Sequence, residues 1–284
     1  MIKRILVALD PDSDTPVAMK YAIHLAHHFG ARLTGLAIVD MEDIYASVGT
    51  GGIGTIYYAD KLREYLTEEN RTEAQLLIKK FHENVEKSGV DYFEAIDEGV
   101  PYERIIEEMK YHDLLIVGSD SHFFYTKPEK ETGTLAKVIK ECITPTLIVA
   151  GEYREVERVL VAFDDSPASA RALHSFVHLL PYGRDIDIEL VHVTDQNSDE
   201  AREEAGLALQ LAGTYLKAHN FEHVEETILE KGNTSEKLLA QIDSTKPDMV
   251  VLGAHSMSAI KRFTFGSTTY DLLRRGKVPL FVDN

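Results

Sequence analysis

Short apolar runs alternate along the whole chain with segments of helical periodicity. The runs in the first half are almost continuously apolar, as are parallel strands covered on both faces; they are residues 4–10, 32–40, 113–119 and 146–151. Between the first two runs, residues 15–29 carry apolar side chains at helical spacing, with Pro16 in the first turn and Gly30 at the stop. This alternation predicts an α/β fold with right-handed helical crossovers.

The second half of the chain repeats the landmarks of the first half in the same order. "KRILVALD" corresponds to "ERVLVAFD", "LTGLAIVD" to "IELVHVTD", and "YHDLLIVGSDS" to "KPDMVVLGAHS". Six such landmarks in one order predict two copies of a single domain, residues 1–151 and 156–284. In each copy we expect a doubly wound, Rossmann-like sheet of five parallel strands.

The first copy carries an extra glycine-rich segment at about residues 41–66. Its glycines lack the lysine of a Walker loop and do not match the dinucleotide fingerprint. We therefore interpret the segment as a mobile lid or an interaction loop, with Tyr57 and Tyr58 packing over a neighbouring pocket or the partner half.

Composition and charge narrow the class of protein. A formal charge of −17 disfavours binding to nucleic acid backbones, which depends on lysine and arginine. No apolar run approaches the roughly 20 residues that span a bilayer, and the N-terminus has no signal-peptide pattern. Because Cys142 is the single cysteine, no intramolecular disulfide can form, and we expect a reduced, cytoplasmic location.

The chemically suggestive residues lie where strands are predicted to end, which is where doubly wound sheets bind ligands. Asp164 ends a strand, Gly253 ends another, and Gly266 and Ser267 open the last helix. The first N–H groups of a helix lack intrahelical partners and stabilise phosphate, whereas a carboxylate suits ribose hydroxyls or an adenine amino group. Each feature alone is more typical of an ordinary turn or helix cap, but the combination, repeated in both halves, favours a nucleotide site.

These residues resemble the universal stress protein family in its tandem form. The family's nucleotide signature is glycine, two residues, glycine, nine residues, glycine, and then serine or threonine. The stretch that starts at Gly253 and ends at Gly266-Ser267 has this spacing, with Ser256 in place of the second glycine. The resemblance covers both halves and implies the adenine nucleotide alpha hydrolase-like version of the fold.

By that resemblance, Asp164 would contact the adenosine and Val193 would offer backbone groups to the adenine. The glycines, Ser267 and Thr268 would surround the phosphates of ATP or a related adenine nucleotide, with or without Mg²⁺. The implied nucleotide-binding residues are Asp164, Val193, Gly253, His255, Ser256, Gly266, Ser267 and Thr268. His255 would contact a phosphate or shape the turn, and Ser256 would narrow the approach or add a hydrogen bond.

The first copy departs from the signature. Eleven residues rather than nine separate Ser121 from Gly133, Asp120 adds negative charge, and the turn from Asp10 to the helix is three residues longer than its counterpart. We therefore expect a weak, altered or empty site there, formed by Asp10, Ile38, Gly118, Ser121, Gly133 and Thr134.

The sequence thus predicts a cytoplasmic stress-response protein that binds an adenine nucleotide, mainly in its second copy, as a regulatory or structural ligand. Family members pair through their last strands, which implies an internal pseudo-dimer or a homodimer. The alternatives are a nucleotide-free protein-interaction module and an adenylating enzyme of the same fold group. No nucleophile elbow or kinase motif occurs, so we expect at most slow ATP hydrolysis. Histidine pairs four residues apart lack a completing cysteine or carboxylate motif, so we expect no metal site. The sequence does not identify the downstream protein partner.

Overall fold

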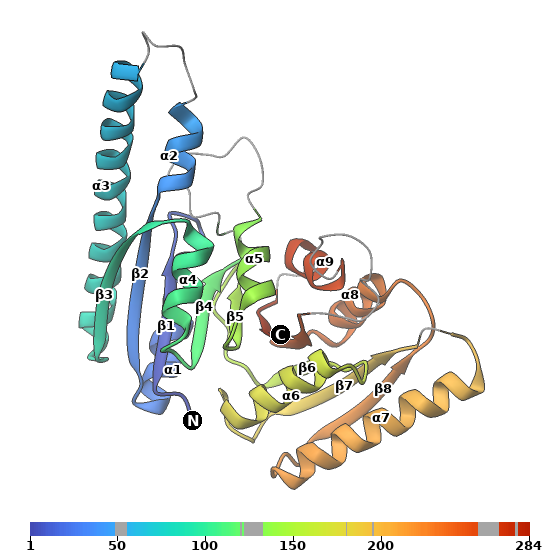
Figure 1. Ribbon diagram of the computed structural model, residues 1–284. Helices are drawn as coiled ribbons and strands as arrows, with labels where there is room; N and C mark the ends of the chain where they lie inside the picture. The colour runs from blue at the N-terminus through green and yellow to red at the C-terminus, as the bar shows by residue number, and fades with distance from the viewer. Residues whose placement is uncertain are drawn as a thin grey trace. The chain divides into compact units, whose positions relative to one another are not determined.

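The computed structural model describes residues 1–48, 56–119, 121, 133–179, 181–194, 196–254, 267–275 and 278–284 (Figure 1). The first copy contains β1 (Arg4–Leu9), α1 (Thr15–Phe29), β2 (Arg32–Asp40), α2 (Met41–Val48), α3 (Ile56–Ser88), β3 (Tyr92–Gly99), α4 (Pro101–Met109), β4 (Leu114–Gly118), α5 (Thr134–Glu141) and β5 (Thr146–Val149). The second contains β6 (Arg158–Ala162), α6 (Pro167–Leu179), β7 (Asp187–Val193), α7 (Asp199–Ala218), β8 (Val224–Leu229), α8 (Thr234–Thr245), β9 (Met249–Gly253), α9 (Ser267–Arg275) and β10 (Leu280–Asp283).

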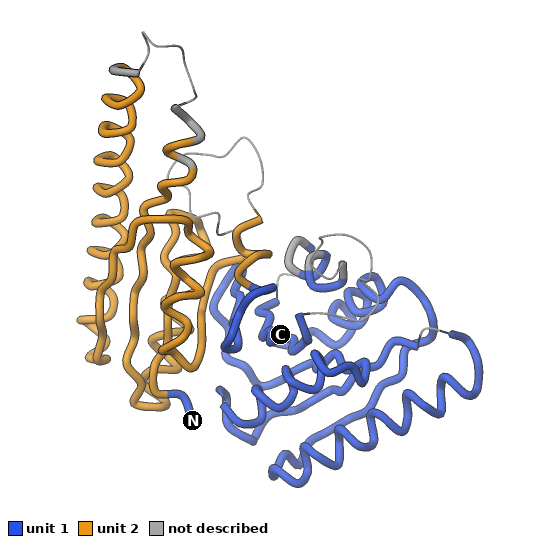
Figure 2. The backbone as a smooth tube through the Cα atoms, viewed as in Figure 1, with its two compact units in different colours: residues 1–2, 139–284 blue, residues 3–138 orange. Residues whose placement is uncertain are grey.

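The chain divides into two compact units, residues 3–138 and residues 139–284 with the first two residues (Figure 2). In the first unit the strands lie in the order β3-β2-β1-β4 and all pair in parallel. Their central members are buried on both faces, as their continuous apolar runs predict.

In the second unit β10, β9, β6, β7 and β8 form a parallel sheet in that order. The predicted five-stranded parallel sheet is therefore confirmed in the second copy. Here β5 pairs antiparallel with β10, with Ile148 opposite Leu280. This pairing explains why the cut between compact units falls between Val138 and Ile139, before the end of the first repeat.

Local signals fix the helix ends, and those of α1 are as predicted. In α1, Pro16 stands in the first turn, and Gly30 ends the helix in the left-handed conformation with φ of 59°. In α6, the Ser166 Oγ accepts a hydrogen bond from the Ser169 N–H at 3.2 Å and so caps the helix ahead of Pro167.

The loop interpretation of residues 41–66 is wrong for residues 41–48 and 56–66, which are helical. The helix α3 continues to Ser88 because apolar residues at helical spacing, such as Phe81 and Val85, are buried against the sheet. The Phe81 ring fills the space beside Gly35, where an added Cβ would lie 2.7 Å from it. The side chain of Tyr58 is 75% exposed, and its packing over a neighbouring pocket or the partner half stays a prediction. The Tyr57 side chain and the glycines lie outside the described residues.

None of the helices in the described part of the chain is apolar over a stretch long enough to cross a bilayer.

Candidate functional site

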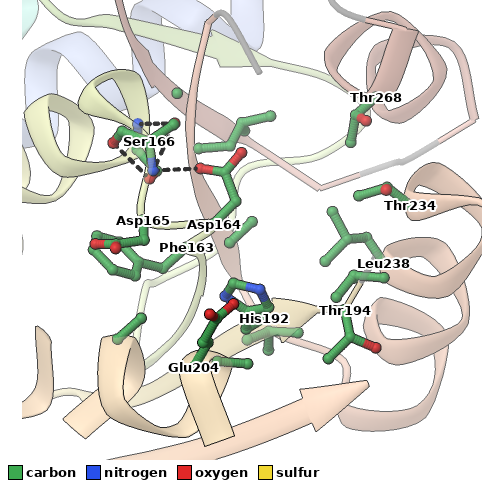
Figure 3. Close-up of a pocket in the computed structure, with 18 of the residues that line it drawn as sticks. Phe163, Asp164, Asp165, Ser166, His192, Thr194, Glu204, Thr234, Leu238 and Thr268 are labelled. Atoms are coloured by element: carbon green, nitrogen blue, oxygen red, sulfur yellow. Dashed lines mark hydrogen bonds between the residues drawn. The ribbon is translucent and has the colours of Figure 1, made fainter. Parts of the chain in front are cut away.

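A cavity of about 400 Å³ lies in the second copy at the carboxyl ends of β6, β7 and β9 (Figure 3). Its walls come from the turn before α6 and from α7, α8 and the first turn of α9. Asp164, Val193, Gly253 and Thr268, four of the residues predicted for this site, line it together. Residues far apart in the sequence are thus brought to the sheet edge at which doubly wound folds bind ligands.

A tight turn holds the Asp164 carboxylate at the cavity. Asp164 Oδ1 accepts a hydrogen bond from the Ser166 N–H at 3.1 Å, and Asp165 between them has a φ of 59°. This left-handed conformation is uncommon for a residue with a side chain. The second carboxylate oxygen of Asp164 points away from the turn (Figure 3). Asp164 is exposed and so offers an acceptor to a ligand.

Gly253 is a glycine because helix α6 lies directly against the end of β9. A Cβ at this position would lie 2.5 Å from the Ala168 carbonyl carbon and 2.6 Å from the Ser169 nitrogen. Both atoms are main-chain atoms, so they could yield only if the helix moved. Packing thus accounts for this glycine, whereas the signature implied a phosphate contact.

The floor of the cavity is apolar and is formed by residues of β7, β9 and α7. Val191, Leu252, Ala205 and Ala208 line it, and the two alanines leave room between helix and sheet. Val193 lies at the end of β7, opposite Leu229 of β8. Such a slot between small and branched apolar residues suits a flat, largely apolar ring.

Further residues that the sequence did not single out, most of them polar, stand around this floor. His192 and Glu204 lie side by side at one end of the cavity, with Thr194, Thr234 and Leu238 across from them (Figure 3). His192 Nδ1 is buried and has no hydrogen-bond partner among the described residues. Thr194 follows Val193 directly, so its position could have been inferred from the strand end; Glu204 and Leu238 come from helix faces that no motif marks.

Two helix N-termini contribute to the other side of the cavity. Thr268 lies in the first turn of α9, and Thr234 is the first residue of α8, where the Asn233 side chain caps the helix by accepting from the Glu236 N–H at 3.1 Å. The positive ends of these helices favour anionic groups. Ser267 begins α9, but its side chain lies outside the described residues, as do His255, Ser256 and Gly266.

The lining is acidic where the Asp164 turn and α7 meet the cavity. Asp164, Asp165 and Glu204 carry carboxylates, and no lysine or arginine belongs to the part of the lining that the structure describes. Negative ligand groups are therefore disfavoured near Asp164, and hydroxyl or amino groups are favoured there.

The corresponding place in the first copy is filled by the protein's own side chains. Asp12 Oδ2 accepts from the Ser121 hydroxyl at 2.7 Å, and Asp14 Oδ2 accepts from the Ser119 hydroxyl at 2.8 Å. Both aspartates lie against Gly118, where an added Cβ would be 2.8 Å from each. The longer turn that follows β1 supplies Asp12, whereas Asp14, two residues before Pro16, corresponds to Asp165, two residues before Pro167.

The remaining residues of the first site are mostly buried. Asp10 is only 2% exposed, and its N–H donates to the Thr15 hydroxyl at 3.1 Å. Ile38 is buried, Gly133 is left-handed with φ of 63°, and Thr134 opens α5 as a buried residue. Asp10 is thus far less accessible than Asp164, its equivalent in the second copy.

Comparisons with known proteins agree with the repeat. The model of the universal stress protein family matches residues 1–150 and 155–283. Universal stress protein Slr1230 of Synechocystis is 22% identical over 289 residues, spanning 98% of this chain and 99% of that protein. Universal stress protein MJ0531 of Methanocaldococcus jannaschii is 29% identical over 159 residues, spanning 55% of this chain and 86% of that protein.

A solved structure shares the fold over the full length. The crystal structure of a universal stress protein from Archaeoglobus fulgidus aligns with 98% of this chain and 97% of its own, with a TM-score of 0.70 at 18% identity. A universal stress protein structure from Pseudomonas aeruginosa aligns with 99% of this chain and 92% of its own, with a TM-score of 0.60 at 15% identity. The chain therefore belongs to the universal stress protein family and carries two copies of its domain.

Proposed function

We propose that the second copy binds ATP or a related adenine nucleotide as a regulatory or structural ligand. The observation that carries the proposal is the cavity at the carboxyl ends of β6, β7 and β9, which combines an apolar floor, an accessible Asp164 carboxylate and the N-terminus of α9. These three features suit the three parts of a nucleotide, namely base, ribose and phosphate.

Each part of the ligand has a favoured place. The adenine would lie on the apolar floor, with the main chain of Val193 at its edge. The ribose hydroxyls would donate to Asp164, and the phosphates would extend towards Thr268 and the positive end of α9. The acidic residues Asp164 and Asp165 favour a nucleotide whose charge is reduced by Mg²⁺ over the bare anion, because like charges repel at short range.

For the first copy we propose a structural role without nucleotide. Its Asp12 and Asp14 side chains occupy the strand end at Gly118, where a ligand would have to approach. A bound nucleotide would have to break both aspartate–serine hydrogen bonds and lie against two carboxylates. The protein would thus hold one nucleotide per chain, in the cytoplasm.

A titration of thermal stability with ATP, ADP and AMP, each with and without Mg²⁺, tests the proposal. At a hundredfold excess over the dissociation constant, a ligand that binds only the folded state stabilises it by about 2.7 kcal/mol. We expect this response in the parent protein and a much smaller one in Asp164→Ala and in Thr268→Asp. The second change sets a carboxylate near the phosphates at a helix N-terminus, where an acidic residue does not harm the helix.

Asp187→Ala is the matched control, because Asp187 is exposed at the opposite end of β7. It should keep the full response. An equal response in all variants, or none in the parent protein, would count against this site.

A further inference from the structure

A row of exposed apolar side chains runs along α3, here called the α3 stripe. Its apolar members are exposed by 43–75% and are Tyr58, Leu62, Tyr65 and Leu76. The opposite face of the same helix is buried against the sheet through residues such as Ala74 and Phe81. The exposed row is therefore additional to the face that the fold of this copy requires.

The spacing of the α3 stripe is that of a coiled-coil seam. Steps of four and three residues alternate from Tyr58 through Leu62 and Tyr65 to Glu69, Thr72 and Leu76. This pattern keeps every member on one side of the helix over about 27 Å. A helix that carries such a seam packs through it against a second helix.

The exposed area is large enough for a weak interface. Covering a tyrosine completely removes about 150–250 Å² from solvent. With Tyr58 75% exposed and Tyr65 63% exposed, the two tyrosines and two leucines offer roughly 300–500 Å² on each copy. A symmetric pair would bury about 600–1,000 Å², the size of a transient, concentration-dependent association.

The polar members of the α3 stripe indicate which partner fits. When the stripe lies antiparallel against a second copy of itself, Tyr65 of each chain faces Glu69 of the other, so the phenol can donate to the carboxylate. Tyr58 then faces Leu76, and Leu62 faces the Thr72 methyl group. In a parallel pair Glu69 would face Glu69, and like charges would repel.

The pairing of strand β10 also favours an interface at α3. In this chain β10 has β5 on one side and β9 on the other, so its edge is already paired within one polypeptide. A second chain therefore needs another surface. We propose that two copies of the chain associate antiparallel through α3, as an isologous pair with a dissociation constant in the micromolar range.

Sedimentation or light scattering as a function of concentration tests the association. The parent chain should shift from one to two chains of 31.9 kDa as its concentration rises through the micromolar range. Leu62→Glu should raise the dissociation constant at least tenfold, and its side chain is exposed enough to leave the fold intact. Leu211→Glu is the control, since Leu211 is 62% exposed on α7 and should leave the association unchanged. A single-chain mass at all concentrations, or equal effects of the two changes, would overturn the proposal.

Cysteine cross-linking tests the orientation, because the native Cys142 is buried. The variants Tyr65→Cys and Glu69→Cys should form an interchain disulfide when mixed, and little when each is oxidised alone. Efficient cross-linking of each variant alone would indicate a parallel pair, and no cross-link in any sample would indicate another surface; either result overturns the antiparallel pairing.

Discussion

Replacing Gly253 by alanine measures how tightly α6 is held against β9 beside the cavity. The added Cβ would lie 2.5 Å and 2.6 Å from main-chain atoms of Ala168 and Ser169, far inside normal contact distance. Because those atoms belong to the first turn of α6, relief requires a shift of the helix. Overpacking of this kind lowers the free energy of unfolding by about 1–3 kcal/mol. Because the close contacts here are with main-chain atoms, we expect a loss of about 2–3 kcal/mol. For a unit of this size, the melting temperature should fall by about 4–12 °C.

Gly206→Ala is the matched control in the same unit. Gly206 lies inside α7, where an added Cβ would lie 3.8 Å from a terminal carbon of Ile228, an ordinary contact distance. The change should stabilise the protein by about 0.5–1 kcal/mol, since glycine is a poor residue in a helix interior. Thermal unfolding followed by circular dichroism checks both variants.

A Gly253→Ala variant that melts within about 1 °C of the parent protein would contradict close packing of α6 against β9. A stable Gly253→Ala variant that no longer responds to nucleotide would instead assign this glycine to ligand approach. A destabilised variant that still responds would assign it to packing.

The remaining predictions concern titrating groups. Burial lowers the pKa of His112, whose Nε2 lies 2.8 Å from the Thr34 hydroxyl. The unfolded chain therefore takes up a proton at this histidine at a higher pH than the folded chain does. The free energy of unfolding should fall as the pH drops below about 6.5. Urea titrations at pH 7.5 and 5.5 should show a smaller fall in His112→Gln than in the parent protein. The hydrogen bond to Glu94 raises the pKa of His82, so its contribution is present below about pH 6.5 and fades as the pH rises through the folded-state pKa. In His82→Gln the stability difference from the parent should shrink at pH 8.5, and also in high salt because both side chains of the pair are partly exposed to solvent. Burial raises the pKa of Asp12, so the charged form is disfavoured in the folded state. Asp12→Asn should raise the free energy of unfolding at pH 7, and denaturation at pH 3.5 should show a smaller gain.

Local patterns in the sequence were sufficient to predict the architecture. The repeat, the apolar strand runs and the caps at Pro16, Gly30 and Ser166 each depend on a few neighbouring residues, and the helices and strands follow them. The insertion was misread because its glycines suggested a loop. The helix on its far side is instead held by Phe81 and similar residues that pack on the sheet, a contact distant in sequence.

Some features of the candidate site could likewise be predicted from the sequence, and others required the structure. The sequence by itself determined that Gly253 ends a strand, that Asp164 closely follows one and that a helix begins near Thr268, because strand ends and helix starts depend on local composition. Only the tertiary structure decided that Gly253 is required by α6, and that His192 and Glu204 border the same cavity. It likewise decided that the aspartates of the first turn fill their own strand end. The pairing of β5 with β10, the last strands of the two copies, agrees with the internal pairing that the family resemblance implied. The physical reason is that close packing and hydrogen bonding between distant segments depend on which side chains meet in space, and periodicity along the chain does not specify those meetings.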